Sequence, residues 1–158
     1  MRLTQDVIAT ARTYYNPLKQ YSLDLRGLKI GIMENLGAAN DQFDMIDLSD
    51  NSIAVVENIP KFNRLEMLIL CNNLINRISS NLGANVPNCR ELVFEEIEHL
   101  KDWINLSILS PIANLSLIDN PIESEPNFRA RVVKLLPQLT VLNFKKVSQK
   151  DREEAANL

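Results

Sequence analysis

The chain has few of the residues that carry catalysis or bind metals. Its 158 residues include one histidine, one tryptophan, two cysteines and four glycines. Cys71 and Cys89 form no CxxC pair, and His99 does not complete a convincing zinc-ligand spacing with them. This cysteine usage is typical of a reducing compartment, the cytosol or the nucleus. We therefore expect no metal and no other cofactor.

Long apolar runs and an excess of positive charge are also missing. No stretch approaches the roughly 20 apolar residues that span a bilayer, so no membrane partner is expected. The net charge of −3 and the pI near 5.2 exclude a global basic field that would attract nucleic acid. Contact with nucleic acid would need local basic patches or a partner protein.

Catalytic signatures are absent as well. No G-x-S-x-G, P-loop, HExxH or dinucleotide-binding fingerprint occurs. The stretch "EEIEHL" places Glu95, Glu96, Glu98 and His99 together, but four residues of one short loop do not easily converge on a metal. A half-buried structural histidine is the better interpretation. We expect no enzyme and no small-molecule substrate.

The organising feature of the chain is an internal repeat. The template L-x-x-L-x-L-x-x-N-x-L fits three segments well and two others in part, at spacings of 22 to 24 residues, and a last partial copy follows near the C-terminus. The three good copies are Phe43, Ile46, Leu48, Asn51, Ile53; Leu65, Leu68, Leu70, Asn73, Ile75; and Ile112, Leu115, Leu117, Asn120, Ile122. The weaker copies are Leu23, Leu25, Leu28, Ile30; Cys89, Leu92, Phe94, Ile97, His99; and Leu139, Leu142, Phe144.

This spacing predicts an α/β fold, a right-handed leucine-rich-repeat solenoid with a parallel concave sheet. Each Leu-x-Leu is a short strand with one buried face, and the asparagine after it bonds the turn backbone of neighbouring coils. Leu28 and Ile97 stand at the asparagine position, so we expect irregular turns there. Trp103 is expected to pack in the core on the convex side.

We expect a single domain over residues 1–158, with caps that cover the apolar ends of the solenoid. A helix in residues 1–20, N-capped by Thr4, would form the first cap, and Asp6 with the tyrosine pair argues against a targeting sequence. Five repeats span 21–122. Residues 123–147 form a C-terminal cap whose helix starts near Pro126 and stops at Pro137. Residues 148–158 are a polar tail, interpreted as a fraying helix.

The concave face is the predicted partner-binding surface. The residue between the two strand leucines points into it, and so does the residue two positions later. The middle of this surface is apolar, which suits an amphipathic helix about 10 Å wide. The candidates are Asp24, Asp47, Ile69, Cys71, Val93, Glu95, Ser116, Ile118 and Asn143. Basic residues near the two ends are candidate phosphate contacts: Arg26, Lys29, Lys146, Lys150 and Arg152.

Beyond the repeat, the wording of several stretches is specific. "LDLRGLKI", "ENLGAANDQFDMIDLSDNSI", "LPQLTVLNFKKV" and "KDREEA" resemble the family of U2 small nuclear ribonucleoprotein A′ proteins of the spliceosome. The resemblance runs from about Leu3 to Ala155. The fourth repeat, "VFEEIEHL", departs most from the family pattern, so the chain resembles a divergent member.

The resemblance implies a nuclear, noncatalytic scaffold. Family members pair through the concave face with a helix of B″, an RNA-recognition-motif protein, and the pair binds a stem-loop of U2 snRNA. Two alternatives without an RNA link stay open from the repeat alone: an adaptor like axonemal dynein light chain, or one like the acidic nuclear phosphoproteins. Neither of these shows the "ENLGA…DQFD" wording.

Overall fold

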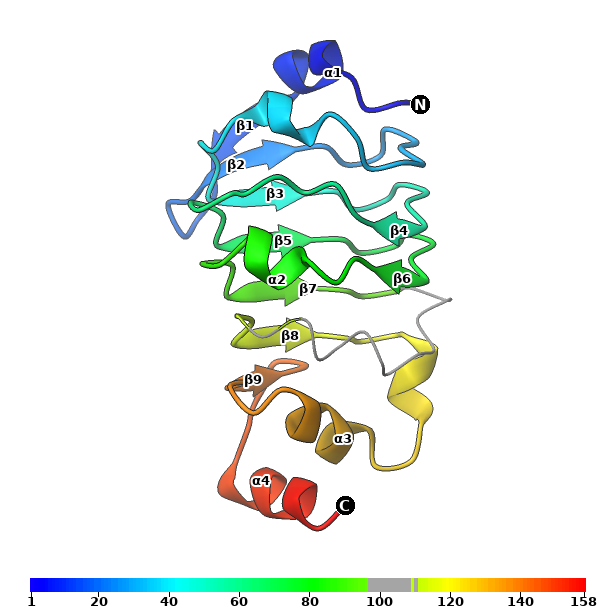
Figure 1. The fold of residues 1–158 in the computed structure, drawn as a ribbon, viewed down its shortest axis with the longest axis vertical. Helices are drawn as coiled ribbons and strands as arrows, with labels where there is room; N and C mark the ends of the chain where they lie inside the picture. Colours follow the sequence, from blue (N-terminus) through cyan, green and yellow to red (C-terminus); the bar gives the residue numbers. More distant parts are fainter. Residues whose placement is uncertain (97–108, 110) are drawn as a thin grey trace.

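The main sheet forms one long wall of the molecule, with its strands stacked like rungs (Figure 1). The computed structural model describes residues 1–96, 109 and 111–158. In this part of the chain the sheet order is β1-β2-β3-β5-β7-β8-β9-β10, and the strands from β2 to β9 are parallel. These parallel strands are β2 (Tyr21–Asp24), β3 (Met45–Asp47), β5 (Met67–Ile69), β7 (Glu91–Val93), β8 (Asn114–Ser116) and β9 (Val141–Leu142). The predicted leucine-rich-repeat solenoid is confirmed.

The strand register places equivalent repeat positions beside one another. Leu23 pairs with Ile46, Ile46 with Leu68, and the same column continues through the later strands. Every member of this column is at most 1% exposed, so each coil closes against the next through aliphatic contacts. The column consists of Leu23, Ile46, Leu68, Leu92, Leu115 and Leu142.

The asparagine positions form the predicted ladder. Asn51 accepts hydrogen bonds from the amides of Leu28 and Ile30, each at 3.0 Å, and donates to three carbonyls of its own and the preceding coil. Asn73 repeats this arrangement one coil later, and Asn120 also bridges to the preceding coil. Asn51 therefore supplies the bonds that the coil with Leu28 cannot make itself. Ile97, the other departure, lies outside the described residues.

The residue before each ladder position adopts a left-handed backbone. The φ values are 64° at Gly27, 58° at Asp50, 51° at Asn72, 55° at Glu96 and 61° at Asp119. Glycine, asparagine and aspartate tolerate this region better than other residues, which explains four of these five positions. Asp50 is thus a turn residue of the coil.

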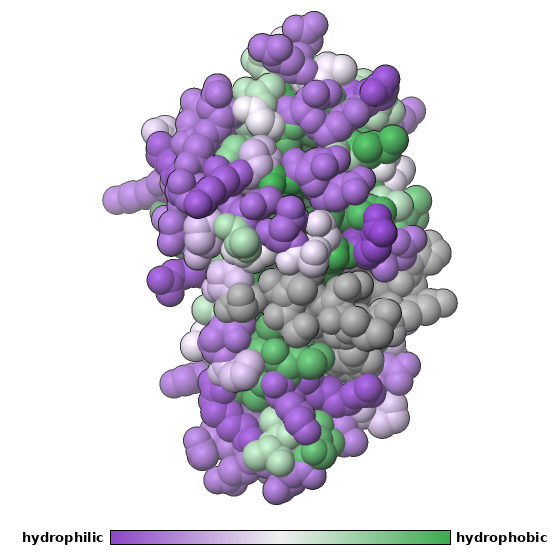
Figure 2. Space-filling view, viewed as in Figure 1, coloured by the Kyte–Doolittle hydropathy of each residue, from purple (hydrophilic) through white to green (hydrophobic). Residues whose placement is uncertain are grey.

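Short elements return the chain on the other side of the coils, where η1 and α2 lie in front of the sheet in Figure 1. They are η1 (Leu36–Ala39), β4 (Val55–Val56), β6 (Arg77–Ile78), α2 (Leu82–Asn85) and η3 (Pro121–Ser124), and β4 pairs with β6 in a second parallel sheet. On this side hydrophilic residues predominate over the N-terminal coils (Figure 2).

Asparagine side chains bridge the coils on this side too. Asn35 donates to the carbonyl of Leu3 and Asn58 to that of Met33. Asn85 donates to the carbonyl of Ile59. These bridges lie outside the repeat template, and together with the ladder they tie neighbouring coils at two places around the solenoid.

The N-terminal cap contains the expected short helix and also a strand that was not expected. The helix α1 covers only Gln5–Thr10, with Thr4 as its N-cap as predicted. After it, β1 (Arg12–Tyr15) runs antiparallel to β2 and adds an edge strand to the sheet. The hairpin between them is closed by Asn16, whose side chain accepts hydrogen bonds from the amides of Leu18 and Gln20.

The C-terminal cap begins with α3 (Phe128–Leu135), which ends before Pro137 as predicted. A two-residue hairpin then joins β9 to β10 (Lys145–Lys146). Its turn residues, Asn143 and Phe144, have φ of 51° and 62°, as a type I′ turn requires. The repeat pattern predicts Phe144 as a core position, and this is wrong: its side chain is 75% exposed, because the chain reverses there.

Residues 148–158, expected to be a fraying tail, contain a capped helix of eight residues. The helix α4 (Gln149–Ala156) starts with a capping box between Ser148 and Asp151, and buries Ala155 against the cap. Arg129 of α3 connects α3 with the hairpin and with α4. Its guanidinium donates hydrogen bonds to the carbonyls of Leu142, Lys145 and Lys146 and contacts the Asp151 carboxylate at 3.1 Å. This ion pair lowers the pKa of Asp151 to about 2.

Candidate protein-binding surface

The concave face carries one row of predicted partner-binding residues in strict register. Asp24 pairs with Asp47, Asp47 with Ile69, Ile69 with Val93 and Val93 with Ser116. Successive side chains of a strand alternate between faces, so this row lies opposite the buried leucine column. The spacing of the repeats therefore predicted the shared face of these five residues correctly.

The centre of this row is apolar and partly accessible. Ile69 and Val93 are half-buried neighbours, and Met67 on the same face is half-buried too. Nothing in the described part of the chain covers them further. Glu91 pairs with Met67 on this face and is also half-buried, which places a carboxylate beside the apolar centre.

The acidic end of the row is neutralised within the chain. Arg26 contacts Asp24 at 3.1 Å and Asp47 at 3.7 Å, and Arg12 contacts Asp24 at 3.8 Å. The hydrogen bond from Arg26 lowers the pKa of Asp24. Asp24 also accepts a hydrogen bond from the backbone amide of Arg26, and Asp47 accepts one from the backbone amide of Ser49. These two carboxylates already hold two guanidiniums, so this end of the row presents little uncompensated negative charge.

Asp47 and Ser116 are more buried than expected for residues on the open face of the sheet, with exposed fractions of 7% and 4%. The Ser116 hydroxyl donates to Glu95 at 2.6 Å, so the two candidates form one polar pair across adjacent coils. Cys71 is half-buried and burial raises its pKa. A neutral thiol extends the apolar centre rather than adding reactivity.

The C-terminal end of the face holds Ile118, which is half-buried, and Asn143. The Asn143 side chain accepts the amide of Leu117 at 2.7 Å. This bond connects the hairpin turn to the last regular coil. The hairpin places the exposed ring of Phe144 directly after Asn143.

The basic candidates fall into two kinds. Lys29, Lys146 and Lys150 are exposed, and Lys150 makes only a 4.0 Å contact with Glu154. Arg26 is engaged by two aspartates, and Arg152 donates to the carbonyls of Pro137 and Leu139, each at 2.9 Å. Within the described part of the chain, no ion pair holds Lys29 or Lys146 and only a long one holds Lys150, whereas the arginines already stabilise the fold.

Arg12 and Tyr14 of β1 lie on the same face and were missed, because residues 1–20 were interpreted as a cap with a short helix and no strand was expected there. Arg12 pairs with Asp24 in the sheet, and its guanidinium lies 4.4 Å from the Tyr14 ring centre. The alternation in "RTYY" before the turn signal "NP" could have indicated a strand.

Two negative findings apply to the described residues. No group of three or more His, Cys, Asp and Glu side chains there could hold a metal ion. No helix there is long and apolar enough to cross a membrane. His99 and Trp103, for which structural roles were predicted, lie outside the described residues, and so does Glu98.

The comparisons with known proteins agree with this architecture. A family model described as leucine-rich repeat matches residues 1–158. The U2 small nuclear ribonucleoprotein A′ of Arabidopsis thaliana is 44% identical over the whole chain, and that of Homo sapiens 39%. The chain spans 64% and 63% of the lengths of these two relatives.

A solved structure matches equally well. The crystal structure of the Drosophila melanogaster SNF/U2A′ complex superimposes with a TM-score of 0.92 at 41% identity. The match covers 99% of this chain and 91% of that chain. The class is therefore the leucine-rich-repeat proteins.

Within that class, the chain belongs to the family of U2 small nuclear ribonucleoprotein A′ proteins.

Proposed function

We propose that the concave face binds a helix of a B″-type RNA-recognition-motif protein. We further propose that the resulting pair binds a stem-loop of U2 snRNA in the nucleus and supports pre-mRNA splicing. The observation that carries this proposal is the half-buried apolar pair of Ile69 and Val93 at the centre of the sheet. A solved U2A′ chain with the same fold was crystallised in a complex with SNF, which supports a protein partner.

The chemistry of the face describes the expected helix. An apolar ridge would cover Met67, Ile69 and Val93, burying them at about 25 cal/mol per Å². Glu91 lies beside this centre, so basic residues flanking the ridge would gain charge-assisted contacts. The expected partner helix is thus amphipathic. In its middle part, basic residues lie on either side of the apolar ridge.

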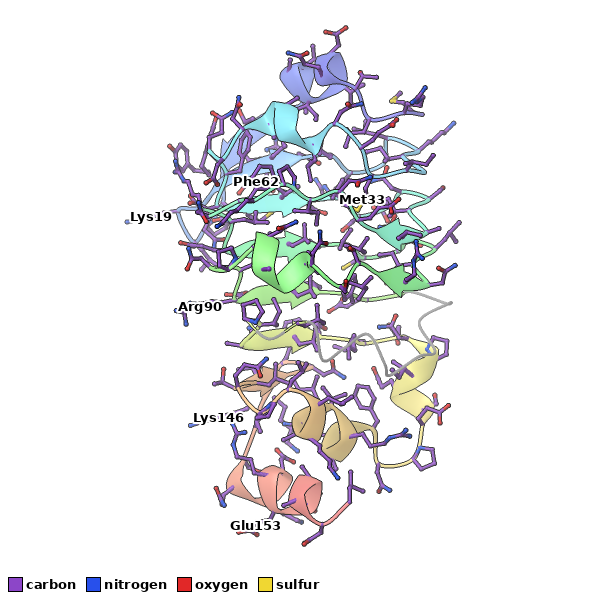
Figure 3. The ribbon with its side chains drawn as sticks, in the orientation of Figure 1. Lys19, Met33, Phe62, Arg90, Lys146 and Glu153 are labelled. Atoms are coloured by element: carbon purple, nitrogen blue, oxygen red, sulfur yellow. The ribbon has the colours of Figure 1, made fainter. Side chains whose placement is uncertain are left out.

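The exposed lysines are the proposed RNA contacts. Lys146 points away from the body of the molecule at the C-terminal end, on the same side as Lys19 and Arg90 (Figure 3). The phosphates would be neutralised by Lys146, Lys150 and Lys29. The side chains of Arg26 and Arg152 already have partners within the chain, so they would only add to the positive electrostatic potential near the RNA. With a net charge of −3, the chain alone should bind RNA weakly and gain affinity with its partner.

The protein interface is tested with Ile69→Glu and a matched change of an exposed residue in β6, on the opposite side of the coils, Arg77→Glu. Isothermal titration calorimetry with the RNA-recognition-motif protein should show lost binding for Ile69→Glu and unchanged binding for Arg77→Glu. Circular dichroism should be native for both, since both side chains are accessible. Retained affinity in Ile69→Glu would exclude the concave face as the interface.

The RNA contacts are tested with the double variant Lys146→Ala and Lys150→Ala. We expect weaker binding of the U2 stem-loop to the protein pair and a salt-dependence slope reduced by up to about 2. Affinity between the two proteins should not change. An unchanged slope would remove both lysines from the RNA interface.

A further inference from the structure

A groove lies beside the concave face, between the N-terminal cap and the first coil. Its volume is about 410 Å³. The apolar lining comes from Val7, Ala11 and Leu28, all of them half-buried. The polar lining includes Arg12, Asp24 and Arg26, which also form the end of the concave row. The groove and the proposed helix-binding surface are therefore continuous.

The two arginines of this groove differ in how fully they are used. Arg26 donates from Nε and Nη2 to Asp24 and approaches Asp47 at 3.7 Å. Among the described residues, the one carboxylate that Arg12 contacts is Asp24, at 3.8 Å, and the Arg12 side chain is 66% exposed. Asp24 therefore holds Arg12 less closely than Arg26, which donates to both of its oxygens.

The Arg12 guanidinium is also held in place. It lies 4.4 Å from the centre of the Tyr14 ring, on a strand that is paired along its full length with β2. A guanidinium stacked on an aromatic ring keeps its N–H groups free at the edge and loses little entropy when a carboxylate binds. The Arg12 guanidinium is thus held at the rim of the groove in a fixed orientation that suits a carboxylate.

We propose that this groove is a second recognition subsite, which receives an acidic segment flanking the helix that the partner protein inserts in the concave face. A carboxylate of that segment pairs with Arg12, and an adjacent apolar side chain rests on Val7, Ala11 and Leu28. The inference depends on the proposed protein–protein interface and deepens it. It assigns the partner an acidic end beside the N-terminal cap and a basic middle beside Glu91.

The test is calorimetric titration of the chain with the RNA-recognition-motif protein at two salt concentrations. Arg12→Gln should weaken binding roughly five- to tenfold at low salt, with a smaller loss at high salt. The matched control is Arg2→Gln, because Arg2 is 81% exposed, pairs with Glu34 and lies outside the groove. The control should stay within about twofold of the unchanged chain, as expected for a solvated surface pair.

A second variant probes the groove without removing charge. Thr10→Trp places a ring in the groove from an exposed position of α1, and should weaken binding while circular dichroism stays native. Charge reversal then identifies the partner group: Arg12→Glu should be rescued when one acidic residue flanking the partner helix is changed to lysine.

Several outcomes would overturn the inference. Equal affinities for Arg12→Gln and Arg2→Gln, an unaffected Thr10→Trp, or no rescue at any acidic position would each exclude the subsite. If Arg12→Gln weakened only RNA binding by the protein pair, the groove would contact phosphate instead. Loss of binding in Ile69→Glu together with an unaffected Arg12→Gln would reject the subsite and leave the helix-binding surface intact. Absence of any binding by the unchanged chain would reject both.

Discussion

Removal of one ladder asparagine should destabilise the solenoid strongly. Asn73 is 3% exposed, accepts the amide of Ile53 at 3.1 Å and donates to the carbonyls of Leu48, Leu70 and Cys71. Asn73→Ala leaves the Ile53 amide buried without this acceptor, at about 1–3 kcal/mol, and removes further bonds worth about 1 kcal/mol each. We expect a loss of about 3 kcal/mol, a large share of a typical stability of about 5–15 kcal/mol.

The assay is urea and thermal unfolding followed by circular dichroism. A loss of this size corresponds to a fall in Tm of about 6–12 °C for a chain of this length. The control is Asn72→Gly, at an exposed position with φ of 51°, where glycine keeps the backbone geometry and only a surface bond to Asp50 is lost. It should change stability by no more than about 0.5 kcal/mol. Similar effects of the two variants would refute the role assigned to the ladder.

Two further predictions concern the C-terminal cap. Because Arg129 lowers the pKa of Asp151 to about 2, the pair contributes stability that is full above the unfolded pKa of about 3.9 and is lost as the pH falls toward 2. Asp151→Asn should therefore cost up to about 2 kcal/mol at pH 7 and little near pH 2, and a cost independent of pH in urea unfolding would contradict this. Phe144→Gly should raise the urea midpoint, with a gain of about 0.5–1 kcal/mol, because it relieves a left-handed phenylalanine that is 75% exposed. A lower midpoint would mean that the ring packs in the folded state.

The regular coils could be predicted because each repeat position has one environment throughout the stack. The buried leucine column and the Asn51, Asn73 and Asn120 ladder follow from the 22- to 24-residue spacing alone. Leu28 at an asparagine position was harmless, since the following coil supplies Asn51. A pattern read along one coil cannot show that compensation.

The ends of the solenoid were less predictable, because periodicity fails where the environment changes. Arg12 fits the helical spacing of the preceding residues in the sequence, but it lies in an edge strand. The signal for this strand, the β-favouring "RTYY" followed by Asn-Pro, is short and stands next to a longer helical pattern. Phe144 fits the repeat in the sequence but faces solvent, because it lies in the hairpin turn where the chain reverses.

The charge state of the candidate surface also needed three-dimensional information. Asp24 and Asp47 are visible in the sequence as a pair of concave acids. Their neutralisation depends on Arg26 reaching diagonally to the next coil and on Arg12 arriving from a strand that was not expected. Adjacent strands lie only about 4.8 Å apart, so such diagonal pairs form readily once the register is set.

The two antiparallel edge strands have a consequence for growth of the sheet. A stack of parallel strands offers open amides and carbonyls at each edge, where another chain could dock and extend it. Here β1 and β10 occupy the two edges, and β10 consists of two lysines that would repel a second copy. Concentrated protein should therefore resist strand-to-strand polymerisation. Whole coils could be inserted or deleted between β2 and β9 without exposing a new edge strand to which another chain could bind.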